Sequence, residues 1–165
     1  MAKTITGTAG CQFDLTVTDT ATSTGSKVVR SLSDSSVRSV TYTNASYVAC
    51  LSGQVGVVGT TVDLYALNDV NDGTYYMYLQ DNTSPIVYAS ILSLVVHNTS
   101  ANTITVAAGA ANSFLTAADQ ITLAAGAAVE LAWGGTAKTV SATVRNFKLT
   151  ASAINSNCEI YILGS

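Results

Sequence analysis

The clearest pattern in this chain is a strict alternation of apolar and polar residues over residues 11–19. The apolar positions of this segment are Cys11, Phe13, Leu15 and Val17. Because successive side chains of a β-strand point to opposite faces, the alternation predicts a strand with one buried face. Residues 158–164 alternate in the same way, so we expect a second strand of this kind at the end of the sequence.

A central stretch, residues 90–131, predicts several more strands separated by short polar and glycine turns. Within it, Ile104-Thr-Val-Ala-Ala-Gly-Ala-Ala returns as Ile121-Thr-Leu-Ala-Ala-Gly-Ala-Ala. In both copies β-branched residues, which favour strands, lead to a glycine that lets the backbone turn back. Between the copies we expect a loop or a short helix over residues 108–119.

A β-hairpin is predicted between residues 61–68 and 74–80, around the turn-forming tripeptide Asn71-Asp72-Gly73. In the expected register one face carries Val62, Leu64, Ala66, Met77 and Leu79. The other face carries Tyr65, Leu67, Tyr76 and Tyr78. A shift by one residue would bring Asp63 to the apolar side, which burial disfavours. The aromatic face is therefore expected either to lie under the edge of a second sheet or to form a contact ridge.

About ten short strands, with no amphipathic helix of useful length, predict an all-β fold. The architecture that we expect is an antiparallel, jelly-roll-like β-sandwich. Residues 1–10 are poor in apolar side chains and are predicted to form an N-terminal arm, whereas residues 11–165 are predicted to form a single sandwich domain. Three closely spaced glycines are expected to produce a bend or a bulge in this domain. They are Gly53, Gly56 and Gly59.

The composition narrows the choice of partners. Only 10% of the residues are charged, against about 25% in a typical soluble domain. A surface with so few charges favours self-association, because large exposed apolar patches usually mark contacts. The net charge is −3, and the sequence has no cluster of lysines or arginines, which argues against binding to nucleic acid or to a membrane surface. The expected partner is another protein or a neutral glycan.

Two features of the sequence bear on redox state and cofactors. The first residues lack the continuous apolar region of a secretory signal, so we expect synthesis in a cytoplasm. Cys11, Cys50 and Cys158 lie far apart and have no metal-ligand spacing. They are interpreted as small apolar side chains, and neither a metal nor another cofactor is expected.

The residues that could support catalysis have simpler structural interpretations. His97, the only histidine, stands at a predicted strand end without a nucleophile motif, so a structural role is expected. The group Asp69, Asn71 and Asp72 resembles part of a calcium loop, but Gly73 stands where the third ligand should be. Four acidic residues are interpreted as solvated rather than as a glycosidase pair. They are Asp14, Asp63, Glu130 and Glu159. We therefore expect no catalytic residue and no enzymatic activity.

Aromatic residues are the remaining candidates for a functional surface. Tyrosine and tryptophan are enriched at protein interfaces, and they also stack on sugars. The predicted interface residues are Tyr65, Leu67, Tyr76, Tyr78 and Trp133. For Trp133, plain packing in the core is an equal alternative.

Five segments between Ile91 and the C-terminus carry a resemblance to a known group of proteins. They are Leu94-Val-Val-His-Asn-Thr-Ser, Asn102-Thr-Ile-Thr-Val, Leu123-Ala-Ala-Gly-Ala-Ala-Val-Glu-Leu, Phe147-Lys-Leu-Thr-Ala-Ser-Ala and Glu159-Ile-Tyr-Ile-Leu-Gly-Ser. This part of the chain resembles the C-terminal half of small structural proteins of tailed bacteriophages, of the head-decoration or cement type.

The resemblance implies a non-enzymatic β-sandwich that binds the outside of a capsid lattice, often as a symmetric homo-oligomer, and stabilises it. The implied partners are the major capsid protein or other virion subunits, and the implied location is the virion. Two other functions stay open at this point. One is a carbohydrate-binding or host-recognition module, and the other is an enzyme on a jelly-roll scaffold.

Overall fold

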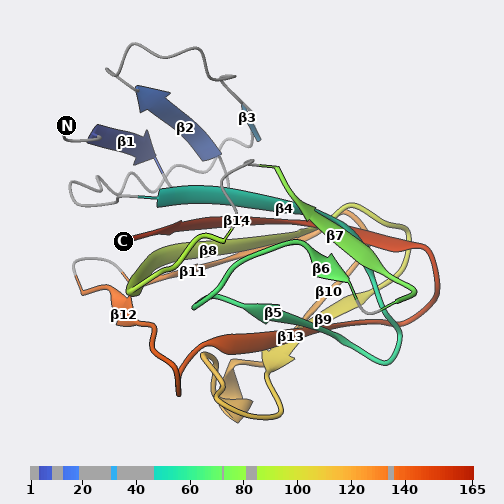
Figure 1. The fold of residues 1–165 in the computed structure, drawn as a ribbon. Helices are drawn as coiled ribbons and strands as arrows, with labels where there is room; N and C mark the ends of the chain where they lie inside the picture. The colour runs from blue at the N-terminus through green and yellow to red at the C-terminus, as the bar shows by residue number, and fades with distance from the viewer. Residues whose placement is uncertain are drawn as a thin grey trace.

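The fold is known from a computed structural model, which describes residues 4–8, 13–18, 31–32, 47–71, 73–80, 85–133 and 136–165. Side chains are described from Ala49 onward. Within these ranges the regular secondary structure is β-strand, apart from one short 3₁₀-helix, η1 (Ala117–Asp119). This helix lies in the segment for which a loop or a short helix was predicted. The strands form two main antiparallel sheets (Figure 1).

The larger sheet has seven strands. Its order is β11-β8-β14-β4-β7-β6, and β12 also pairs with β8. The strands are β4 (Tyr47–Val55), β6 (Val70–Asn71), β7 (Tyr76–Leu79), β8 (Ser90–Asn98), β11 (Ala128–Ala132), β12 (Lys138–Thr139) and β14 (Ser156–Gly164). At its centre the alternating residues of β14 pair with both β8 and β4.

The smaller sheet has four strands in the order β10-β9-β13-β5. They are β5 (Thr60–Asp63), β9 (Ile104–Ala108), β10 (Ile121–Leu123) and β13 (Asn146–Ala151). Two antiparallel sheets of this kind confirm the predicted all-β sandwich, whereas the jelly-roll arrangement stays a prediction.

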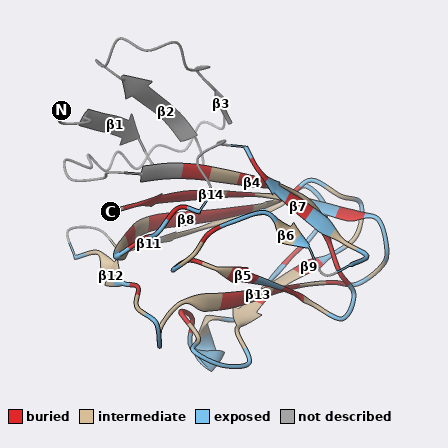
Figure 2. Ribbon diagram, viewed as in Figure 1, coloured by how far each residue is buried: buried red, intermediate tan, exposed pale blue. Residues whose placement is uncertain are grey.

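The core lies between the two sheets and is made by alternate residues of each strand. Leu51, Val96 and Ile160 of the large sheet are fully buried, as are Phe147 and Leu149 of the small sheet. Figure 2 shows the buried positions along β4, β8, β13 and β14. Burying each side chain of this size contributes roughly 1.5–3 kcal/mol, so the alternation that predicts the strands also fixes which face turns inward.

The near-repeat of the central stretch pairs with itself. Ile121 lies opposite Val106, Thr122 opposite Thr105, and Leu123 opposite Ile104. The two threonine Oγ1 atoms at the middle of this pairing are 3.2 Å apart. The apolar residues on either side contribute to the core, which explains why the same Ile-Thr-aliphatic triplet suits both strands.

The predicted hairpin between residues 61–68 and 74–80 is wrong. β5 belongs to the four-stranded sheet and pairs with β13, whereas β7 belongs to the seven-stranded sheet. Between them the chain crosses from one sheet to the other. The backbone N–H of Leu64 donates to the Arg145 carbonyl, and Leu67 forms a bridge with Ile86. The predicted turn residues instead stand between β7 and the two-residue strand β6, with Val70 opposite Met77.

The three glycines Gly53, Gly56 and Gly59 do not form one bend or bulge as predicted. β4 continues through Gly53 to Val55, so no interruption occurs at Gly53. The chain turns at the later glycines, where the N–H of Gly59 donates to the carbonyl of Gly56 at 3.2 Å. Gly53 is constrained for another reason. It has φ +152°, and a Cβ there would overlap the backbone of Tyr76 on the neighbouring strand β7.

A third sheet of three strands lies in the N-terminal part of the sequence. It contains β1 (Thr4–Thr8), β2 (Phe13–Thr18) and β3 (Ser31–Leu32) in that order. β2 confirms the strand predicted from the alternation over residues 11–19. The segment predicted to be an arm, residues 1–10, contains β1, whose five residues all pair with β2.

Candidate functional site

The most exposed aromatic group of the two main sheets is a pair of tyrosines on β7. Met77 and Leu79 of this strand are buried in the core, so the alternate residues Tyr76 and Tyr78 lie on the outward face of the sheet. Their side chains are 41% and 55% exposed, respectively. The rings are stacked, with centroids 6.3 Å apart and planes 12° from parallel. They form a rigid aromatic ridge next to the short edge strand β6, which we call the tyrosine ridge.

Tyr65 does not share a face with the tyrosine ridge as predicted, because it follows β5 of the other sheet. Its ring is 38% exposed, and the guanidinium of Arg145 lies 5.3 Å from the ring centroid. Arg145 also donates two hydrogen bonds to Asp63, one of them from Nε to Oδ1 at 2.9 Å. These bonds raise the pKa of Arg145. Tyr65 therefore belongs to a local cluster with the Arg145 guanidinium and the Asp63 carboxylate.

Leu67, a predicted interface residue, does not lie on an exposed face. Its side chain is fully buried in the core, because the crossing segment turns it inward beside Ile86. The prediction placed it on the same face as Tyr65 by assuming a regular strand over residues 61–68. The bend after Asp63, where Oδ1 accepts the N–H of Tyr65 at 2.9 Å, breaks that alternation.

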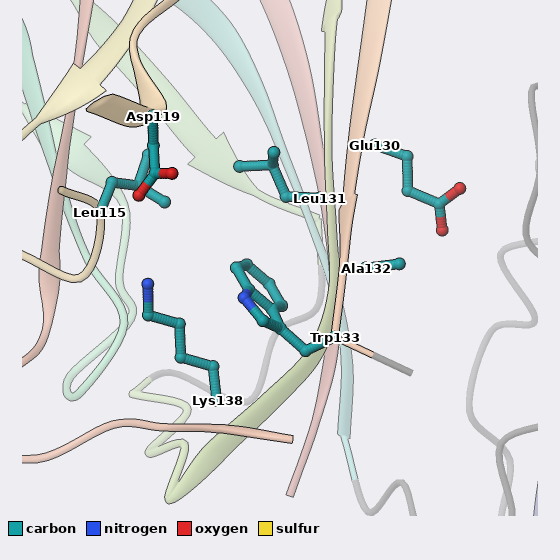
Figure 3. Close-up of a pocket in the computed structure, with 7 residues that line it drawn as sticks. All are labelled: Leu115, Asp119, Glu130, Leu131, Ala132, Trp133 and Lys138. Carbon is teal, nitrogen blue, oxygen red and sulfur yellow. The ribbon is translucent and has the colours of Figure 1, made fainter. Parts of the chain in front are cut away.

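Trp133 forms one wall of a small pocket at the end of β11. Figure 3 shows Leu131 and Trp133 on one side of this strand, directed toward Leu115, Asp119 and Lys138. The pocket has a volume of about 250 Å³. The Trp133 ring meets the buried ring of Phe114 edge-on, with centroids 5.1 Å apart. Trp133 therefore both packs against the core and presents part of its surface to a cavity.

Opposite charges enter this pocket from two separate segments. Lys138, on β12, holds its Nζ 4.7 Å from the centroid of Phe114 and 5.4 Å from that of Trp133, which are cation–π distances. Asp119 caps η1, where Oδ2 accepts the N–H and the hydroxyl of Thr116 at 2.7 and 2.9 Å. These bonds, followed by the charge of Lys138, lower the pKa of Asp119. The pocket thus combines an aromatic wall with a carboxylate and an ammonium group.

The sequence prediction named Trp133 but missed Asp119 and Lys138. Asp119 had a detectable signal, since Thr116-x-x-Asp119 has the spacing of a reciprocal helix cap. For Lys138 we find no local signal, because its position over two aromatic rings arises only when β12 pairs with β8.

His97 lies on the outward face of β8, with Glu159 of β14 opposite it. Its Nδ1 is 3.7 Å from Glu159 Oε2, which accepts a 2.7 Å hydrogen bond from the hydroxyl of Tyr161. Within the part of the chain that the structure describes, this Nδ1 is buried and has no hydrogen-bond partner. The geometry therefore places a histidine beside a carboxylate.

Asp69 and Asn71 of the suspected calcium loop have structural roles, whereas Asp72 of that group and Asp14 lie outside the residues whose side chains the structure describes. Asn71 accepts the N–H of Gly73 at 2.7 Å, as turn residues do, and Asp69 accepts the N–H of Leu79 on β7 at the same distance. Glu130 accepts a 3.0 Å hydrogen bond from Ser93 on the outward face of the large sheet. Among the described residues no group of three His, Cys, Asp or Glu side chains is arranged to hold a metal ion.

The buried cysteine of β14 fits its predicted role as a small apolar side chain. Cys158 is 1% exposed and belongs to the core cluster. Burial, followed by the neighbouring Glu159 and Cys50, raises the pKa of its thiol to about 12. The thiolate is therefore a minor species near neutral pH.

Comparison of the chain with protein-family models, with curated proteins and with solved structures gave no match. Across the described ranges, no helix has the length and apolar character needed to cross a membrane. Two aromatic surfaces are therefore the candidate functional sites: the tyrosine ridge and the pocket of Trp133.

Proposed function

We propose that this chain is a non-enzymatic structural protein of a bacteriophage particle, which binds the capsid lattice and stabilises it. The tyrosine ridge on β7 is the proposed contact with the shell protein, and its exposure is the single observation that carries the proposal. The resemblance of residues 91–164 to phage decoration proteins supports this function, as does a charged fraction of only 10%.

The tyrosine ridge suits a protein contact because its two rings are already held in one arrangement before a partner binds. A tyrosine ring offers a large contact area for few rotatable bonds, and interface residues of this type often dominate the binding energy. Because Tyr76 and Tyr78 already stack on each other, little side-chain entropy is lost when a partner covers them. The strand beneath them is held by Met77 and Leu79 in the core, so the ridge has a rigid base.

The test uses the full chain and purified particles of the virus that encodes it, prepared from a strain in which this gene is deleted. Added protein should co-sediment with the particles and saturate at a fixed ratio to the shell protein. The double variant Tyr76→Ser/Tyr78→Ser should bind more than about tenfold more weakly, since truncation of a central interface aromatic commonly costs about 2 kcal/mol or more.

Val58→Ser is the matched control, because Val58 is an exposed apolar residue in the turn after β4, away from the ridge. This variant should bind as the unchanged chain does. Absence of saturable binding would reject the lattice function. Equal binding by the double tyrosine variant would reject the ridge as the contact.

A carbohydrate-binding function is the second candidate, and the pocket of Trp133 favours it specifically. An indole face offers stacking to the C–H face of a sugar ring, and the Asp119 carboxylate and the Lys138 ammonium group could hydrogen-bond its hydroxyls. A volume of about 250 Å³ suits one monosaccharide unit of a longer glycan better than a large ligand.

Trp133 is the only tryptophan of the chain, so its fluorescence reports on this pocket alone. Titration with a panel of neutral oligosaccharides should change the emission in a saturable way if the pocket binds a glycan. Asp119→Asn should weaken this binding, whereas Asp69→Asn, a carboxylate of the β6 turn region, should leave it unchanged. Emission that stays constant across the panel would reject this second function.

A further inference from the structure

The outward face of the seven-stranded sheet contains buried apolar residues that do not belong to the core between the sheets. The strand register places Val95 beside Tyr161, and Ser93 beside Leu163, on the face opposite the core residues Leu94 and Val96. Val95 is 5% exposed, Leu163 1% and Ser93 0%. Residues on a solvent-facing sheet surface would be far more exposed, so this part of the face has a cover.

Neither main sheet provides that cover, because the four-stranded sheet packs on the opposite face. Figure 3 shows the same division on β11, where Trp133 points to the pocket between the sheets and Glu130 points to the other side. Glu130 pairs in register with Val95, and desolvation raises its pKa despite its hydrogen bond from Ser93. The buried patch centred on Val95, Ser93 and Leu163 is here called the outer patch.

The small N-terminal sheet has an apolar face that needs a partner. Its register pairs Ile5 with Val17, Gly7 with Leu15, and Phe13 with Leu32. Directly opposed residues share a face of a sheet, so these apolar positions fall on one face. The positions between them are threonine, aspartate and serine. A sheet with one apolar face must bury it against another element.

We propose that the sheet β1-β2-β3 packs its apolar face on the outer patch of the same chain and forms a third layer of the fold. The path of the chain supports this assignment. Tyr47, the first residue of β4, pairs with Gly164, which adjoins Leu163 of the outer patch. The described chain therefore resumes, at Tyr47, directly beside the patch. Residues 33–46 can span at most about 50 Å, which is ample for the sheet to reach it.

The third layer is independent of the lattice function and compatible with it. Tyr78 pairs with Ser52 of β4, so the tyrosine ridge lies on the same outward face, toward the β6 edge. The ridge is exposed where the outer patch is buried. Docking of the N-terminal sheet thus divides this face into a covered apolar half and an open aromatic half.

The test measures access to the outer patch in the full chain. Ser93→Cys supplies a reporter thiol at a fully buried position, in a background in which Cys11→Ser and Cys50→Ser remove two of the three natural cysteines. Cys158 remains as a core thiol. With a soluble thiol reagent, Ser93→Cys should be protected in this chain. Addition of Leu15→Asp, on the apolar face of β2, should raise its labelling rate by more than about tenfold, because undocking of the layer opens the patch.

Thr16→Asp is the matched control, since it adds the same charge to the polar face of β2. It should leave the reporter protected. Rapid labelling of Ser93→Cys without further changes would show that nothing covers the patch and would overturn the proposal. Protection that survives Leu15→Asp, or that depends on protein concentration, would assign the cover to another segment or to a second copy and would overturn it equally.

A second readout does not need the reporter thiol. In the otherwise unchanged chain, Leu15→Asp should increase binding of an apolar fluorescent dye, whereas Thr16→Asp should not. Equal dye binding by the two variants would count against the third layer. Lattice binding depends on the tyrosine ridge and not on the outer patch. A loss of lattice binding and an unprotected outer patch are therefore separate results.

Discussion

Replacement of Asn98 by alanine should be one of the most damaging single changes outside the apolar core. Asn98 ends β8 and is fully buried. Its Nδ2 donates to the carbonyl oxygens of Asn102, Leu123 and Ala124 at 2.7, 3.2 and 2.8 Å. Its Oδ1 accepts the N–H and the hydroxyl of Ser100 at 3.0 and 2.7 Å. One amide therefore connects β8, the loop that follows it and the turn between β10 and β11.

The expected loss follows from these contacts. Nδ2 carries two hydrogens, so its three carbonyl contacts amount to two hydrogen bonds, and Oδ1 accepts a third from the N–H of Ser100. A net contribution of about 0.5–1.5 kcal/mol for each of these three bonds gives a loss of about 3 kcal/mol for Asn98→Ala. In a chain of this length each 1 kcal/mol lowers Tm by about 2–4 °C, so Tm should fall by about 6–12 °C. Asn98→Asp should be no better at neutral pH, because it places a carboxylate against three carbonyl oxygens.

Urea unfolding followed by circular dichroism measures this loss. Asn157→Ala is the control, since Asn157 is an exposed asparagine on the adjacent strand β14. It should change the unfolding free energy by less than about 0.5 kcal/mol, as surface substitutions usually do. A loss for Asn98→Ala no larger than that of the control would refute the assignment of Asn98 as the junction of the three segments.

Three further outcomes are expected. In urea unfolding, Gly53→Ala should lower the free energy of unfolding by more than about 2 kcal/mol, because its Cβ would overlap the Tyr76 backbone. Gly126→Ala is the control: its φ is +71° and the space around it is open, so it should lower the free energy of unfolding by only about 1 kcal/mol. Burial holds the pKa of Glu130 above its ordinary value of 4.5, so its contribution to stability is greatest below that value and is lost as pH rises through the raised pKa. Glu130→Gln should therefore reduce the fall of the urea midpoint as pH rises above 4.5, and an unchanged pH profile would contradict this. His97→Ala should leave lattice binding intact, and loss of binding by a folded variant would overturn its structural interpretation.

Residue alternation predicted β2 and β14, because a period of two residues is a local property of the sequence. The near-repeat predicted strands at Ile104 and Ile121, although their direct pairing emerged only from the structure. The short helix before β10 was also anticipated.

The predicted hairpin failed because strand pairing is decided by contacts distant in sequence. The pattern over residues 61–68 is compatible with one long strand, but Leu64 bonds with Arg145 and Leu67 with Ile86. These partners bend the segment and carry it to the other sheet. The same limitation hid the pocket of Trp133, since Asp119 and Lys138 meet there only after η1 and β12 take their places in the fold.

In the proposed function, the tyrosine ridge binds this protein to a capsid shell. Electron cryo-microscopy of gene-deleted particles with the purified chain added back would show this contact. We expect density for the sandwich at regular lattice positions, with β7 and its two tyrosines against the shell protein. Particles without added density, or with β7 turned toward solvent, would contradict it.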